Sequence, residues 1–137
     1  MQAHINSKII KKSLLIWLAI IPIAIINGVL REKILTHIIG NYAFFVSGII
    51  LISAIFIITW IFLPRLGKGS QKTYIVIGLL WAALTVIFEF CMGIFVSGFS
   101  ISQIITAYDI TTGNIWLVVV IFTGFSPWLT AKLRHIF

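Results

Sequence analysis

Charged residues are scarce in this 137-residue chain, and acids are the scarcest: Asp and Glu total 3, against 10 Lys and Arg. Only 9% of the residues are charged and 61% are hydrophobic, whereas a soluble domain carries roughly 25% charged residues. So few charges cannot cover a surface that faces water. The composition therefore excludes an ordinary soluble domain and predicts a protein surrounded mostly by lipid.

Residues for disulfide and metal chemistry are also few. The one cysteine, Cys91, lies in an apolar run, so no internal disulfide can form. The three histidines fall in separate polar segments, and no Cys/His cluster has the spacing of a zinc site. No nucleophile–base pair or phosphate-binding loop is recognisable. We therefore expect no metal, no cofactor and no catalytic residue, which argues against an enzyme without excluding one.

The excess of basic residues gives a net charge of +7. In a soluble protein this charge would suggest nucleic acid as a partner. Here the bases lie beside apolar runs, where membrane topology and anionic lipid headgroups explain them better. We expect membrane lipids as partners, and no nucleic acid.

Four apolar stretches are long enough to cross a bilayer as helices. Pro22 predicts a kink in the first stretch, which we interpret as a retained span because it is longer than a typical signal core. The predicted fold class is all-α, a polytopic membrane four-helix bundle forming one domain over residues 1–137. The expected spans are residues 13–30, 42–63, 74–96 and 115–131.

A short amphipathic helix is expected between the two spans of each half. Residues 32–39 place their apolar side chains on one helical face and lead to Gly40, a typical helix stop. Residues 101–108 repeat the pattern. Ser100 and Gln103, at the start of this segment, have capping-box spacing. The bundle would thus consist of two hairpins, each with an interfacial helix. Both connections lead to Gly-Asn, which indicates an internal duplication or ordinary helix-start chemistry.

The basic residues segregate along the chain. Eight of them lie in the two tails and the middle turn, and only Arg31 and Lys33 lie in the other connections. The positive-inside rule then places both termini in the cytoplasm and both interfacial helices on the outer side. This threading puts all three acids, Glu32, Glu89 and Asp109, toward the outer side.

Glu89 is the one carboxylate within a predicted span. It belongs to a stripe of small or polar side chains that would let this helix pack centrally: Gly78, Ala82, Thr85, Glu89, Gly93 and Ser97. A bare carboxylate in lipid is costly, so we expect Glu89 to pair with Arg31 in an outer-side polar pocket. The alternative is an ion pair that only fixes helix register. The candidate binding residues are Asn27, Arg31, Glu32, Glu89, Tyr108, Asp109 and Asn114.

These residues also carry a resemblance. They resemble a pattern in a group of small bacterial four-span membrane proteins of no assigned activity: Asn27-Gly28, Arg31-Glu32, Thr85, Phe88-Glu89-Phe90, Gly93, Tyr108-Asp109, Gly113 and Trp116. The likeness covers most of the chain, although the group more often has Asn where Asp109 stands and Arg where Asn114 stands. It implies four spans, the same polar positions and a bacterial inner membrane location, and it implies no reaction.

Three kinds of function fit these predictions. The first is binding or transport of a small solute, ion or lipid headgroup at the outer pocket, as a homo-oligomer because four helices are few for a transport path. The second is a non-catalytic structural or accessory subunit of a larger membrane complex. The third, least supported, is a membrane enzyme acting on lipid, with Glu89 or Asp109 as general base.

Overall fold

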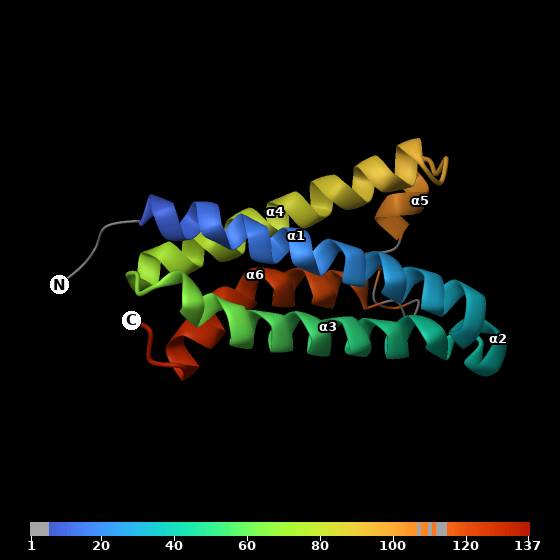
Figure 1. The fold of residues 1–137 in the computed structure, drawn as a ribbon. Helices are drawn as coiled ribbons and strands as arrows, with labels where there is room; N and C mark the ends of the chain where they lie inside the picture. The colour runs from blue at the N-terminus through green and yellow to red at the C-terminus, as the bar shows by residue number, and fades with distance from the viewer. Residues whose placement is uncertain (1–5, 107, 110, 112–114) are drawn as a thin grey trace.

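The computed structural model describes residues 6–106, 108, 109, 111 and 115–137. Within them lie four helices long and apolar enough to cross a membrane, spanning Ser7–Ile39, Tyr42–Leu66, Gln71–Phe95 and Trp116–Leu133. They pack as an all-α four-helix bundle (Figure 1). Large apolar side chains on the outside of the bundle stay exposed, including Leu15, Leu79 and Ile121 at 67%, 67% and 61%. A surface of this kind suits lipid, and the predicted fold class is confirmed.

The first helix is longer than the sequence predicts. Helix α1 (Ser7–Leu30) begins at Asn6, whose side chain caps the amides of Lys8 and Ile9. It continues without a break through a π-helical segment, η1 (Arg31–Leu35), into α2 (Thr36–Ile39). Gly40 ends it with a φ of 61°, a conformation that favours glycine. The expected separate helix over residues 32–39 is therefore helical but continuous with the first span.

The other helices run in sequence along the bundle. Helix α3 (Tyr42–Phe62) leads into a 3-10 turn, η2 (Leu63–Leu66), which contains Pro64. Helix α4 (Gln71–Phe95) follows, then the short α5 (Ile101–Thr106) and finally α6 (Trp116–Leu133).

The closest contact in the bundle joins α4 and α6. A Cβ atom added at Gly78 would lie 1.9 Å from the carbonyl oxygen of Gly124, and one added at Gly124 would lie 3.3 Å from Cβ of Ala82. Small residues thus let the two backbones approach, as the stripe on α4 predicts. Beyond this contact α4 leans away from α1 toward α5 (Figure 1).

The two ends of the bundle differ in charge. Both termini and the turn between α3 and α4 lie at one end (Figure 1), where the amide of Asn6 donates to Oγ1 of Thr73 at 3.0 Å. Arg134 there donates to the carbonyl of Trp60 at 3.0 Å and stacks over its ring. The segments at this end carry eight basic residues, Lys8, Lys11, Lys12, Arg65, Lys68, Lys72, Lys132 and Arg134. The opposite end, with α2 and α5, is the one hollowed by the pocket described below.

Candidate functional site

A buried hydrogen-bonded pair joins α1 to α3 beneath the pocket. Nδ2 of Asn27 donates to the carbonyl of Ser47 at 3.1 Å, and the hydroxyl of Ser47 donates back to Oδ1 of Asn27. Asn27 and Ser47 are only 6% and 1% exposed. Buried polar groups in lipid need partners inside the protein, so this reciprocal pair fixes how the first hairpin packs.

Arg31 lies one helical turn beyond Asn27, at the start of the π-helical segment. Its Nη1 lies 3.5 Å from Oγ of Ser47, a long hydrogen bond, and its guanidinium carbon lies 5.1 Å from the ring centre of Phe44. Buried Nε of Arg31 has no hydrogen-bond partner among the described residues. The hydroxyl of Thr36 donates to the carbonyl of Arg31 at 2.7 Å and so satisfies a backbone acceptor in the π-helical segment. Single π-helical turns are frequent at functional sites, and this one presents Arg31 to the pocket with donor capacity unused.

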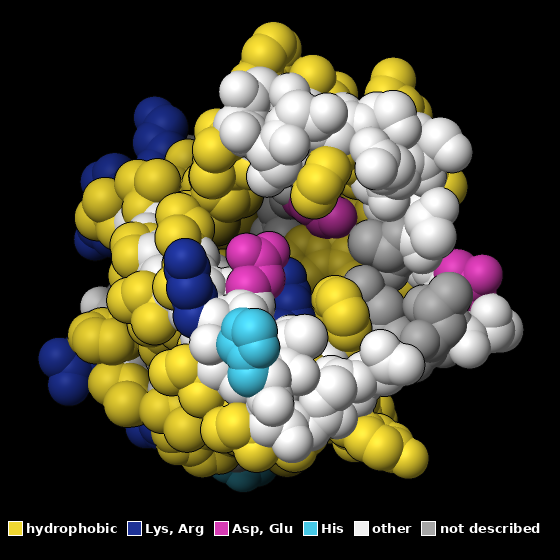
Figure 2. Space-filling view, turned by 90° about the vertical axis from the view of Figure 1, so that its right-hand side faces the viewer, with side chains coloured by type: hydrophobic (Ala, Val, Ile, Leu, Met, Phe, Trp, Pro, Cys, Tyr) yellow, Lys and Arg dark blue, Asp and Glu magenta, His cyan; other side chains and the backbone are white. Residues whose placement is uncertain are grey.

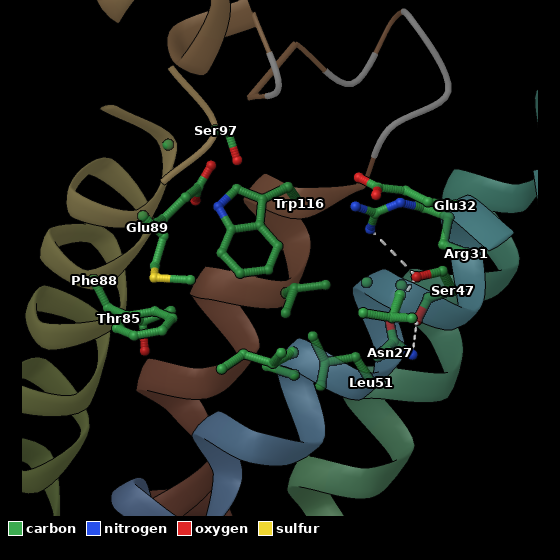
Figure 3. A pocket seen from close by; sticks show the side chains of 18 of the residues that line it. Asn27, Arg31, Glu32, Ser47, Leu51, Thr85, Phe88, Glu89, Ser97 and Trp116 are labelled. Carbon is green, nitrogen blue, oxygen red and sulfur yellow. Dashed lines mark hydrogen bonds between the residues drawn. The ribbon is translucent and has the colours of Figure 1, made fainter. Parts of the chain in front are cut away.

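Glu89 comes from the opposite wall, on α4. The hydroxyl of Tyr108 donates to its Oε2 at 2.9 Å, and the ring of Tyr108 stacks on Phe90 with the centres 6.5 Å apart. The indole nitrogen of Trp116 points toward the same carboxylate (Figure 3). Two aromatic groups with polar hydrogens therefore surround Glu89.

Helix α5 is positioned by close packing on α4. A Cβ atom added at Gly93 would lie 2.7 Å from Cδ1 of Ile104, which is the buried residue of α5. At the start of α5, the amide of Ser100 donates to Oε1 of Gln103 at 2.8 Å, and the amide of Gln103 donates back to Oγ of Ser100 at 3.2 Å. The predicted capping box is thus confirmed, and α5 brings the following Tyr108 over Glu89.

A pocket of about 510 Å³ separates the two walls. Its charged lining residues are Arg31, Glu32 and Glu89. Most of the others are apolar, including Leu51, Phe88 and Val119, and polar Asn27, Ser47 and Thr85 also line it. Figure 2 shows the hollow from the end of the bundle, with charged side chains near its mouth and hydrophobic ones within. The charged groups thus gather near the mouth, and apolar side chains form most of the remaining wall.

The expected Arg31–Glu89 ion pair is not formed. The two side chains face each other across the pocket without touching (Figure 3). Glu32, the sequence neighbour of Arg31, lies nearer to the guanidinium and interacts with it more strongly. The prediction of the direct pair was wrong because it matched the two residues by depth and charge, whereas the lean of α4 away from α1 sets their separation.

The remaining predicted residues have different outcomes. The pocket is lined by Asn27, Arg31, Glu32 and Glu89. Tyr108 is hydrogen-bonded to the lining residue Glu89. Asp109 does not line it: its exposed carboxylate accepts from the amide and hydroxyl of Thr111 at 3.0 and 2.6 Å. These bonds lower the pKa of Asp109, as expected for a carboxylate that fixes a turn. Asn114 lies outside the described residues.

Several lining residues are not among the candidate binding residues that the sequence predicts. Thr85 is named there only in the small-residue stripe and the resemblance, Trp116 only in the resemblance, and Ser47 is not singled out. The indole N–H of Trp17 donates to Oγ1 of Thr85 at 3.0 Å, and its ring meets Phe88 edge-on at 6.4 Å between centres. These contacts close the pocket at its deep end. The sequence feature that could have identified these residues is that each carries a polar group within an apolar span.

Tyr108 is the titratable group of the site outside the four long helices. Burial raises its pKa to about 12, because removal from water disfavours the charged phenolate, and the neighbouring Glu89 carboxylate acts in the same direction. Trp116 opposes the shift. Tyr108 is therefore a neutral hydrogen-bond donor to Glu89 at physiological pH.

The fold and the site together define a multi-pass helical membrane protein with a charged, partly apolar pocket at one end. No group of three His, Cys, Asp or Glu side chains that could hold a metal occurs in the described part of the chain. No protein-family model matches the sequence, and no curated protein or solved structure is detectably similar to it. The geometry and charges of the pocket are therefore the basis for a function.

Proposed function

We propose that this protein is a small membrane protein that binds a small solute or a lipid headgroup in the pocket between Arg31 and Glu89. The observation that carries the proposal is the separation of these two opposite charges by an open volume of about 510 Å³. Ligand pockets typically enclose roughly 300–1,000 Å³ with mostly apolar walls and a few placed polar groups. Intramembrane charges that do not pair with each other favour a functional role.

The pocket supports binding more than transport by a single chain. Below it, Trp17, Thr85 and Phe88 close the space between α1 and α4. Further along the bundle, Ile55 and Trp81 are 2% and 0% exposed, so the packed core blocks a path through the described chain. Transport would require a rearrangement or a second copy of the chain. An open pocket also supports binding over the purely structural function, for which a closed ion pair would suffice.

We place the pocket on the outer side of a bacterial inner membrane, with both termini in the cytoplasm. The support is the distribution of charge, with eight bases in the segments at the end that holds both termini and two at the other. A ligand would then enter from the periplasmic side or from the outer leaflet.

Thermal unfolding of the purified protein in detergent, screened against amino acids, amines, phosphates and lipids, tests the proposal. A ligand at 100 times its Kd stabilises the folded state by about 2.7 kcal/mol. We expect at least one class to raise the unfolding midpoint, and a pocket-filling variant, Ala24→Phe, to lose this response. The Lys33→Gln variant, altered at an exposed position, is the matched control and should retain it. A folded protein that responds to none of these classes would contradict the proposal.

A further inference from the structure

Resting on the proposed function, we infer that the ligand is a zwitterionic lipid with a phosphate and an ammonium group, held by its headgroup between Arg31 and Glu89. Three features of the pocket carry this inference: the sign and position of its charges, the apolar character of its depth, and the divergence of the two helices at its side.

The charges on the two walls match a zwitterion. On one wall, Arg31 is anchored by Ser47 and Phe44, and its buried Nε has no partner among the described residues. Guanidinium groups bind phosphate through several parallel donors. On the other wall, the Glu89 carboxylate accepts from Tyr108, an uncharged donor, and does not touch Arg31. The Glu32 carboxylate lies beside the guanidinium, so a phosphate would bind the remaining donors of Arg31, including Nε, while an ammonium would bind at Glu89.

The aromatic groups around Glu89 suit an ammonium group. Trp116 points its indole nitrogen at the carboxylate (Figure 3), and Phe88 lines the pocket beside it. The negative face of an aromatic ring attracts a cation, and both of these rings line the pocket. A purely anionic headgroup would instead be repelled by the Glu89 carboxylate.

The depth and the side of the pocket suit an acyl chain. Most of the uncharged lining is apolar, including Ile21 and Ala24 from α1 and Phe88 and Met92 from α4. These two helices touch at Trp17 and then diverge toward α5 (Figure 1). A lipid could therefore place its headgroup in the mouth and leave its chains along the diverging helices, in the surrounding bilayer. A free headgroup would leave the apolar part empty.

The experiment compares lipids on the full chain. Delipidated protein is exposed to detergent micelles of phosphatidylethanolamine mixed equally with phosphatidylglycerol, and the bound lipid is quantified by native mass spectrometry. The wild type should enrich the zwitterionic lipid about tenfold, the effect of one charge-assisted hydrogen bond. Glu89→Gln should remove the enrichment while phosphatidylglycerol still binds. Arg31→Gln should weaken both lipids, and Lys33→Gln should behave as wild type.

A second arm separates a lipid from its soluble headgroup. Glycerophosphoethanolamine, which has the phosphate and the ammonium without acyl chains, should raise the unfolding midpoint much less than the intact lipid at equal concentration. Equal stabilisation by both would overturn the lipid assignment. Equal binding of the two lipids by the wild type, or unchanged enrichment in Glu89→Gln, would overturn the zwitterion. If another class in the solute screen still binds, the proposed function survives; if none binds, both fail.

Discussion

Asn27 and Ser47 show how much of the site is set at the scale of single residues. Asn27 was selected from the sequence because it precedes Arg31 by one turn, but its partner could not be. Ser47 is one of several serines in apolar spans, and only the packing of α1 on α3 shows that it bonds Asn27 twice. Side-chain types predict which residues are polar in lipid, whereas the pairing depends on helix rotation.

Replacing Asn27 tests how much the Asn27–Ser47 pair contributes to the stability of the fold. Asn27→Ala would leave the buried groups of Ser47 without their partner, which costs about 1–3 kcal/mol. The midpoint of denaturant unfolding in detergent should fall accordingly. Asn41→Ala, at an exposed position with no side-chain capping bond, is the control and should change little. Equal midpoints for the two variants would contradict the assignment.

The raised pKa of Tyr108 predicts how the stability of the protein changes at alkaline pH. Its pKa is raised from 10.0 to about 12 in the folded protein, so its neutral form is favoured by folding. Its contribution to stability is then complete below pH 10 and is lost as pH rises toward 12. The stability difference between the wild type and Tyr108→Phe should be level just below pH 10 and should move against the wild type above it. Parallel stability curves up to pH 12 would argue against a buried phenol bonded to Glu89.

Helix α4 determines the shape of the site at the scale of elements. Its length and its stripe of small residues could be read from the sequence, and the contact of Gly78 with Gly124 agrees with them. Its lean away from α1 could not, because tilt depends on the packing of all four helices together. The π-helical segment at Arg31 escaped prediction for a related reason, since the bond from Thr36 to the carbonyl of Arg31 depends on local backbone geometry.

Adding one methyl group at the α4–α6 contact should disturb this packing. In Gly78→Ala the new Cβ would meet the carbonyl of Gly124 at 1.9 Å, so the helices must separate. Overpacking of this kind costs about 1–3 kcal/mol, and the unfolding midpoint should fall. Gly28→Ala adds the same methyl group in a helix with its nearest neighbour 3.8 Å away, and should be tolerated. A Gly78→Ala protein as stable as Gly28→Ala would refute the close contact.

The whole molecule is polarised, with bases gathered at one end and a pocket containing two of the three acids at the other. This polarity could be predicted from counting charges, and it leads to a topology prediction. Alkaline phosphatase, which needs oxidising surroundings for its disulfides, should be active when fused after Gly40 and inactive when fused after Phe137. Activity in the opposite pattern would invert the orientation and place the pocket on the cytoplasmic side.

The account depends most on the pocket being open to water and reaching the level of Glu89. In a Cys91→Ser background, a cysteine replaces Met92, which lines the pocket, or Leu79, which is 67% exposed on the outside of the same helix. A charged, membrane-impermeant thiol reagent reacts with thiolates in water. Added to protein embedded in a bilayer, it should modify Met92→Cys rapidly and leave Leu79→Cys unmodified. A Met92→Cys protein as unreactive as Leu79→Cys would show a closed, dry bundle end and contradict the binding site.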